Sequence, residues 1–360
     1  MPTPPSSPLT VYQEEPLNAG TPFDRLRCSF LTPADQFYVR THGPRPQVEP
    51  DTYRLLVRGL VRNPLELGLA ELLGRFEQHT LTATLVCAGN RRNELATVRP
   101  LCNEILWGAD AIGTGRWRGV RLSDVLNAAG LGAGARHVAF VGLDRTRVDG
   151  AVAPFGASIP LEKALSPEVL LVHTMNDAPL TREHGFPLRV LVPGYVGARS
   201  VKWLHTITVQ REPSTNYFQA KDYKVFPPEV TAETVDWSRG EPLSDIALNS
   251  AICSPRERQV LPAAATVVQG YAIAGEVPVH RVELSVDGGA SWTPAALTGP
   301  TERWAWRFWE ATLDLPRGDR EITVRAWDAV GRTQPAEMGA LWNFKGYANN
   351  AWHRVRVGVA

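Results

Sequence analysis

The chain has 360 residues, more than a single hydrophobic core usually contains, so its length predicts two domains. Its 38 Lys and Arg residues nearly balance 37 Asp and Glu residues, and this net charge of +1 argues against a nucleic-acid-binding surface. No apolar run approaches the roughly 18 residues that a membrane-spanning helix needs, so we expect no membrane association.

The first segment, residues 1–24, is rich in proline and serine at its start and has no hydrophobic periodicity. We expect it to form an extended arm. It lacks the basic stretch and apolar core of a secretory signal. The expected location is therefore the cytoplasm, or the periplasm if a signal has been removed.

Residues 25–244 alternate short strand-like and helix-like runs, which predicts a mixed α+β domain. Apolar runs that begin at Tyr53 and that span 80–89 predict strands, the second of which ends in a glycine-containing turn. Between 120 and 131 the apolar residues recur at helical spacing, and Gly130 suits a helix end, so we expect a helix there.

Residues 245–360 have a different sequence pattern, in which strand-like runs follow one another with turn residues between them. The clearest hairpin is the segment SVDGGASW, in which Asp287 is followed by two glycines that tolerate positive φ. This spacing of strands predicts an all-β domain, and an immunoglobulin-like sandwich is the natural fold for such a segment.

The most informative cysteine is Cys87, within the segment LVCAGNRRNE. It lies where a buried strand is expected to end, before a flexible turn and two arginines, and such surroundings stabilise a thiolate. A buried structural cysteine is the alternative interpretation. The other cysteines are Cys28, Cys102 and Cys253, and the four form no C-x-x-C pair, which argues against zinc, an iron–sulfur cluster and a disulfide framework.

Cations cluster near other predicted strand ends. Arg40 and His42 share one side of an extended segment, since residues two apart face the same way. Further along, His184, Arg189, Arg199 and Lys202 surround a glycine-rich bend. Such a group suits a phosphate or another compact oxyanion. The alternative is that each cation is solvated or paired with an acidic side chain.

Seven motifs extend this pattern across the chain: FYVRTH, CAGNRR, HGFPLRVLVPGYVGARSVKWL, KDYK, SVDGGASW, WAWRFW and NAWHRV. Together, over about residues 37–357, they resemble the sulfite oxidase family of molybdenum enzymes. The resemblance implies an N-terminal α+β molybdopterin-binding domain and a C-terminal immunoglobulin-like domain through which such enzymes form homodimers. It also implies two-electron oxidation of a small oxyanion, sulfite, by oxo transfer.

The family's motifs can be matched to this chain residue by residue. The resemblance implies that Cys87 is the protein ligand of molybdenum, beside the soft sulfur atoms of the pterin. The residues that would hold the cofactor are Phe37, Tyr38, Arg40, His42, Cys87, Asp144, His184, Arg189, Ser200 and Lys202. The residues that would form the substrate pocket are Arg40, Arg92, Trp107, Tyr223 and Lys345.

Lys345 departs from the family pattern. Where animal members have an arginine in a segment like NLRG, this chain reads Asn343-Phe344-Lys345-Gly346. Lysine keeps the positive charge but lacks the bidentate fork of a guanidinium group. We therefore expect weaker or altered binding of the anion.

The redox partner is a second expectation. No haem domain precedes residue 37 and no C-x-x-C-H motif is present, so we expect no haem in this chain. Electrons would pass to a separate acceptor, a cytochrome or oxygen. The alternatives are a molybdenum reductase of another oxyanion such as nitrate, a binding module with a decayed site, and a hydrolase in which Cys87 is the nucleophile and His42 or His184 the base.

Overall fold

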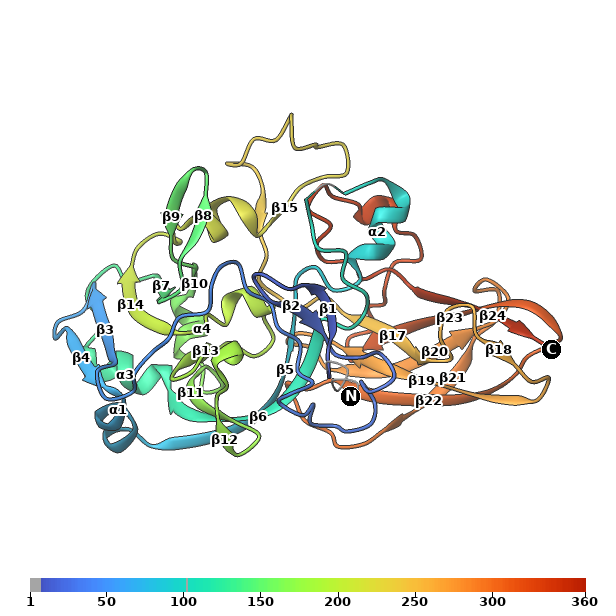
Figure 1. Ribbon diagram of the computed structural model, residues 1–360, viewed down its shortest axis with the longest axis horizontal. Coiled ribbons are helices and arrows are strands. Elements are labelled where there is room, and N and C mark those ends of the chain that lie inside the picture. The colour runs from blue at the N-terminus through green and yellow to red at the C-terminus, as the bar shows by residue number, and fades with distance from the viewer. Residues whose placement is uncertain (1–7, 102) are drawn as a thin grey trace, which may run out of the picture.

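The structure is a computed structural model that describes residues 8–101 and 103–360. Residues 1–7 of the expected arm and Cys102 lie outside this part of the chain. The N-terminal part (residues 8–244) and the C-terminal part (residues 245–360) lie side by side, and both consist mainly of strands (Figure 1).

The first sheet of the N-terminal part has five strands. Their order is β10 (Gly156–Pro160), β7 (His137–Gly142), β14 (Leu204–Gln210), β3 (Arg54–Gly59) and β4 (Leu65–Gly68). Within β3, Leu55 and Val57 are buried whereas Arg54 and Arg58 are exposed, the alternation of a strand with one face on a core. The strand predicted near Tyr53 is thereby confirmed.

The second sheet carries the segment that leads to Cys87. Its order is β12 (Ala178–Pro179), β11 (Leu170–Met175), β6 (Ile112–Arg121) and β5 (Gln78–Val86), with β13 (Arg189–Leu191) paired to β11. Antiparallel pairing joins β5 to β6 from Gln78 opposite Val120 to Val86 opposite Ile112. The predicted strand therefore exists and ends one residue before Cys87, which fixes the position where the chain leaves the sheet.

Helices are short in the described residues. They are α1 (Leu69–Arg75), α2 (Arg92–Val98), α3 (Leu122–Ala129) and α4 (Leu161–Leu165). The predicted helix is confirmed as α3, whose buried residues Leu122, Val125, Leu126 and Ala129 recur at intervals of three and four. It ends at Gly130, where φ is 68°, a conformation that glycine adopts without strain.

A strand pair occupies the place of the expected extended arm: β1 (Thr10–Gln13) pairs with β2 (Asn18–Gly20). All three residues of β2 are buried, and the Ala19 and Val39 backbones exchange two hydrogen bonds of 2.9 and 2.8 Å. These contacts hold the segment on the protein. The remaining short elements are β8 (Thr146–Val148), β9 (Ala151–Ala153), β15 (Lys224–Val225), β16 (Glu241–Pro242), and the helical turns η1 (Arg182–His184), η2 (Gly197–Arg199), η3 (Phe218–Asp222) and η4 (Gly339–Leu341).

The C-terminal part is an all-β domain. Its strand order is β17 (Asn249–Ser254), β19 (Ala265–Ile273), β22 (Arg307–Asp314), β21 (Thr293–Thr298), β20 (Val279–Ser285), β23 (Gly318–Asp328), β24 (His353–Val359) and β18 (Val260–Leu261). Ile252 and Val268 of the neighbouring strands β17 and β19 share one hydrophobic core with Val324 of β23, which is far from them in this order, so the sheet folds over on itself. The predicted hairpin is confirmed, since β20 pairs with β21 and Gly288 and Gly289 have positive φ.

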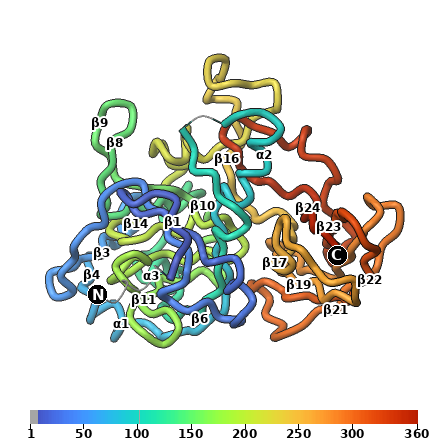
Figure 2. Tube along the Cα trace, turned by 45° about the vertical axis from the view of Figure 1, so that its right-hand side comes forward, coloured from blue at the N-terminus to red at the C-terminus, as the bar shows by residue number. Residues whose placement is uncertain are grey.

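The two parts meet along the segment that follows Cys87. The N–H of Ala348 donates to the carbonyl of Ala88 at 2.9 Å, and the indole of Trp342 donates to the carbonyl of Arg99 at 3.1 Å. In Figure 2, α2 lies beside the red chain that precedes β24. In the described residues, no helix has the length and apolar character needed to cross a membrane.

Candidate active site

A cavity with an empty volume of about 680 Å³ opens beside the end of β5. The predicted site residues on its walls are Phe37, Tyr38, Arg40, His42, Cys87, Asp144, His184, Arg189, Ser200, Lys202 and Tyr223. The structure therefore brings together side chains from distant segments of the N-terminal part. The predicted residues Arg92, Trp107 and Lys345 do not line it.

Cys87 lies where the chain leaves β5 and turns toward α2. Its N–H donates to the carbonyl of Ala111 at 2.9 Å, and its carbonyl accepts from the N–H of Asn90 at 3.0 Å. The residue is 7% exposed, packs in a cluster that includes Phe37, and is a free cysteine. A thiol fixed by its backbone beside a cationic cavity is suited to bind a soft metal.

Two cations on the cavity wall, the buried Arg189 and the partly buried Lys202, have no carboxylate within ion-pair distance among the described residues. Arg189 donates to the carbonyls of His184 (3.1 Å) and Ser200 (2.9 Å), while its Nε has no acceptor in the part of the chain that the structure describes. Lys202 donates to the carbonyls of Arg40 (2.9 Å) and Glu183 (2.8 Å). Burial lowers the pKa of Arg189 to about 10, and burial followed by Arg189 lowers that of Lys202 well below its usual value. A bound anion would relieve both penalties.

The side chains on the cavity wall can be compared with the needs of a cofactor that carries a phosphate group. His184 adds a neutral imidazole, because burial and then Lys202 lower its pKa to about 3. Asp144 is the acidic residue on the wall, and burial raises its pKa. The donor set combines one thiol, a guanidinium, an ammonium and an unsatisfied buried Nε. It fits a ligand that carries both a soft metal and a phosphate group.

Arg40, His42 and Tyr223 form a hydrogen-bonded line along the cavity. Arg40 Nη2 lies 3.2 Å from His42 Nδ1, and His42 Nε2 lies 2.8 Å from the Tyr223 hydroxyl. Burial and then Arg40 lower the pKa of His42 well below its ordinary value, so the ring is neutral at pH 7. An arginine can only donate, so Nδ1 accepts and Nε2 carries the proton. His42 therefore donates to Tyr223, which leaves the tyrosine proton free for another acceptor.

The missed residue Asn18, from β2, holds Arg40 in place. Its Oδ1 accepts from Arg40 Nη1 at 3.1 Å and from the backbone N–H of Thr41 at 2.9 Å. Its Nδ2 donates to Gln13 Oε1 at 2.9 Å and to the carbonyl of Pro16 at 3.0 Å. Asn18 is fully buried. No pattern in the sequence distinguishes this asparagine, because its partners are contributed by tertiary structure.

Arg92 and Lys345 lie behind the cavity in ion pairs. Arg92 Nη1 lies 3.1 Å from Glu104, and Lys345 Nζ lies 2.5 Å from Glu104 and 2.7 Å from Asp222. Burial opposes the charge on Lys345, but Asp222 and Glu104 outweigh it and raise the lysine pKa. The tyrosine ring of Tyr347 links this group to the cavity, stacked on Tyr223 with centroids 5.3 Å apart. Lys345 is thus engaged by two acids.

Trp107 is fully buried in the cluster that contains Cys87, rather than on the cavity wall. Its ring lies 4.8 Å from that of Tyr12 on β1, whose hydroxyl is 2.9 Å from both carboxylate oxygens of Asp110. The Nε1 of Trp107 has no acceptor among the described residues. Glu104, Asp222 and Tyr347 were missed as well, although Asp222 belongs to the motif KDYK.

Comparisons with known proteins identify the family to which the chain is related. A family model described as the oxidoreductase molybdopterin binding domain matches residues 42–218, and one described as the Mo-co oxidoreductase dimerisation domain matches residues 241–360. The chain is 44% identical to the sulfite oxidase of Gallus gallus over 98% of its own length and 78% of that protein. It is 40% identical to the sulfite oxidase of Arabidopsis thaliana, over 98% of the chain and 94% of that protein.

A solved structure is similar over the whole chain. It is the sulfane dehydrogenase SoxCD from Paracoccus pantotrophus, with a TM-score of 0.78 and 25% sequence identity. The match covers 100% of this chain and 90% of that chain. The likeness therefore includes both the part with the cavity and the all-β part.

Proposed function

Since the chain belongs to the sulfite oxidase family, we propose that it oxidises sulfite to sulfate with a molybdenum–molybdopterin cofactor. It is a molybdenum-dependent oxidoreductase. The observation that carries the proposal is the cavity beside Cys87, where a thiol faces the same space as two cations that have no carboxylate partner in residues 8–101 and 103–360. A decayed binding module would have no physical reason to keep such a set of costly buried charges.

The cofactor would be held by the cavity residues. Cys87 would bind the metal, and Arg189 and Lys202 would bind the phosphate, with His184 and Ser200 as hydrogen-bonding partners. The predicted cofactor contacts on the remaining walls are Phe37, Tyr38, Arg40, His42 and Asp144. When bound, the group supplies a two-electron redox change and the oxygen atom that sulfite gains.

Sulfite would bind against Arg40 and Tyr223. The guanidinium pairs with the anion's oxygens, and Tyr223 donates its free proton, since its own oxygen already accepts from His42 at 2.8 Å. Burial raises the pKa of Tyr223, which keeps this proton in place. The hydroxyl therefore orients the substrate and does not act as a base.

Arg92, Trp107 and Lys345 remain proposed members of the substrate pocket, in an indirect role. Their neighbours support it, because Glu104 and Asp222 already engage the two cations. Direct contact with the anion would require Arg92 or Lys345 to leave a carboxylate partner. Trp107 would fix the shape of the wall that carries Cys87.

The wider organisation completes the proposal. We infer domain boundaries at 25–244 and 245–360, an immunoglobulin-like sandwich for the second domain, and a homodimer formed through it, for which the match to a dimerisation domain is the support. Electrons would pass to a separate acceptor, a cytochrome or oxygen. The location would be the cytoplasm, or the periplasm after removal of a signal.

Elemental analysis paired with a sulfite-dependent ferricyanide reduction assay tests the function. We expect about one molybdenum per chain and turnover with sulfite but not reduction of nitrate. Cys87→Ser should abolish turnover while the midpoint of thermal unfolding stays near that of the parent, because a hydroxyl is a poor ligand for a soft metal. Protein expressed with a cofactor supply yet free of molybdenum, or full activity in Cys87→Ser, would contradict the proposal.

A further inference from the structure

The segment after Cys87, residues 88–94, forms hydrogen bonds with the C-terminal part at several positions. These bonds indicate that the C-terminal part has a role beyond dimerisation. We propose that the C-terminal part positions the Cys87 loop (residues 87–92), with Tyr271, Asn249 and Asn349 as positioning residues that act through Asn90 and Arg91. The importance of this positioning for catalysis rests on the proposed function, whereas the ability of the contacts to hold the loop in place does not.

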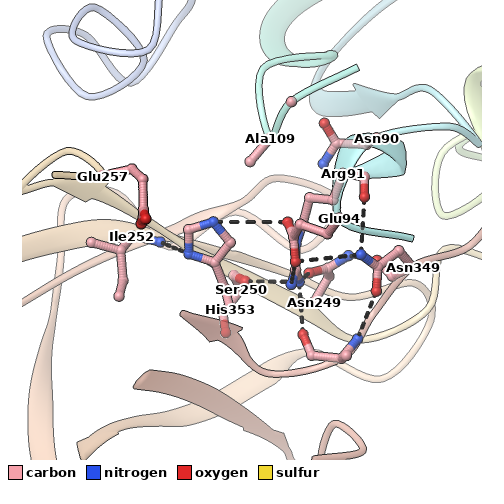
Figure 3. Close-up of polar contacts among 12 residues, drawn as sticks. Asn90, Arg91, Glu94, Ala109, Asn249, Ser250, Ile252, Glu257, Asn349 and His353 are labelled. Atoms are coloured by element: carbon pink, nitrogen blue, oxygen red, sulfur yellow. Dashed lines mark hydrogen bonds and ion pairs between the residues drawn. The ribbon is translucent and has the colours of Figure 1, made fainter. Parts of the chain in front are cut away.

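Arg91 is the centre of this contact (Figure 3). Its side chain is fully buried and its Nη1 donates to Asn249 Oδ1 at 2.7 Å and to the carbonyl of Ala351 at 2.8 Å. Its Nε and Nη2 form a bidentate pair with Glu94 at 2.8 and 2.7 Å. The guanidinium thus pairs with Glu94 of α2 on one side and, on the other, with Asn249 of β17 and the carbonyl of Ala351 from the C-terminal part.

The backbone of Arg91 is held in an unusual conformation. Its φ is 65°, in the left-handed region that non-glycine residues rarely adopt. Its N–H donates to the carbonyl of Gly108 at 2.8 Å, and its carbonyl accepts from Asn349 Nδ2 at 2.9 Å. Such a conformation persists only where surrounding contacts determine it. Here one of those contacts comes from the C-terminal part.

Glu94 closes the network from α2. Asn349 Nδ2 also lies 3.4 Å from Glu94 Oε2, and His353 Nε2 lies 3.9 Å from Oε1 (Figure 3). The other nitrogen of His353 accepts from the N–H of Ile252 at 3.2 Å. The motif NAWHRV, which has no place in the cavity, is therefore explained, because it lies against the charged pair that begins α2.

A second line of hydrogen bonds runs from Tyr271 to Cys87 itself. Asn90 Nδ2 donates to the Tyr271 hydroxyl at 3.1 Å, and that hydroxyl donates to the carbonyl of Ala109 at 3.0 Å. Asn90 Oδ1 accepts from the N–H of Ala111 at 3.0 Å. The carbonyl of Ala111 in turn accepts from the N–H of Cys87 at 2.9 Å. Through Asn90, the tyrosine thus supports Ala111, whose carbonyl holds the backbone of Cys87.

The physical consequence concerns precision. A metal ligand must be held to within a fraction of an ångström, and the residues that fix it are as important as the ligand. Because Ala88 also accepts from Ala348 at 2.9 Å, the loop is fastened on the side of the C-terminal part at Ala88, Asn90 and Arg91. Without these bonds the segment would depend on its contacts within the N-terminal part, such as those of Cys87 with Ala111 and of Arg91 with Gly108.

Tyr271→Phe tests this role, because it removes one hydroxyl and keeps the ring. Tyr53→Phe is the matched control, since Tyr53 is also buried and its hydroxyl donates to the carbonyl of Leu204 in the first sheet, away from the loop. Asn249→Ala removes an acceptor of Arg91 and serves if Tyr271→Phe does not fold. Holoenzymes are compared by molybdenum content, thiolate-to-metal absorption and kcat, and cofactor-free proteins by the rate at which iodoacetamide alkylates Cys87, followed by peptide mass spectrometry.

We expect Tyr271→Phe to raise the alkylation rate of Cys87 and to lower kcat, each by about fivefold, with a shifted absorption band and near-normal molybdenum content. Tyr53→Phe should change only the melting temperature. Equal alkylation rates in Tyr271→Phe and the parent, or an equal change in Tyr53→Phe, would overturn the positioning role. A parent protein that binds no molybdenum would instead defeat the proposed function, and the alkylation rates would still decide the mechanical question.

Discussion

At the residue scale, the hydroxyl of Tyr223 has a defined direction. It accepts from His42 at 2.8 Å, so its proton is available to an oxygen of the substrate. A hydrogen bond to a charged partner contributes about 1.5–3 kcal/mol. We therefore expect Tyr223→Phe to lower kcat/KM for sulfite by about 10- to 100-fold. Steady-state kinetics at equal molybdenum content measure this loss, and an unchanged kcat/KM would exclude contact with the substrate.

The role of Lys345 is also tested at the residue scale, by one substitution that keeps its charge and one that removes it. With Arg92, Glu104 and Asp222 it forms a group whose charges cancel. Lys345→Arg should leave the sulfite KM within about twofold, because a guanidinium can keep both acids. Lys345→Gln leaves a net negative charge behind the cavity and should raise KM by about tenfold. A lower KM in Lys345→Arg would mean instead that residue 345 reaches the anion.

At the scale of elements, the β1–β2 pair supports the cavity through Asn18. Removal of this side chain costs Arg40 one acceptor, at 3.1 Å, without removing its charge. Asn18→Ala should raise the sulfite KM by about fivefold, as expected for one hydrogen bond of about 1 kcal/mol. Gln13→Ala, which removes only an exposed partner of Asn18, is the control. Equal KM values in all three proteins would contradict a role of the strand pair.

The same element marks the limit of what the sequence predicts. The strand before Cys87, the helix that ends at Gly130 and the Asp287 hairpin follow from local patterns, and the structure contains all three. The cations of the cavity could also be predicted, because they lie in short sequence motifs. Asn18 and the acids around Lys345 could not be found this way, because each contact joins residues from elements far apart in the chain. For the same reason, part of the segment that was expected to be an extended arm forms the β1–β2 strand pair in the structure.

At the scale of the whole molecule, buried histidines predict sensitivity to acid. Burial lowers the pKa of His184 to about 3 and of His353 to about 4, and that of His42 well below its usual value. The unfolded chain binds these protons near pH 6.5, so stability is lost as the pH falls from about 6.5 toward 4. Each histidine contributes about 1.4 kcal/mol per pH unit, and Asp110, whose pKa burial raises to about 6, opposes one of them.

Urea unfolding of the cofactor-free protein at pH 7 and pH 5 measures this effect. We expect a lower free energy of unfolding at pH 5. His353→Asn should reduce the difference, because an amide oxygen can still accept from the N–H of Ile252 but does not titrate. Equal stability at the two pH values would show that the histidines already bind protons in the fold.

The position of the Cys87 loop between the two parts also has a consequence for biosynthesis. Its supports at Asn349, Ala351 and His353 are translated long after Cys87 itself. While the ribosome is still adding the C-terminal strands, the thiol lies on a loop with only part of its framework. Cofactor loading is therefore expected to follow completion of β24, which makes metal insertion a late, post-translational step in the maturation of this protein.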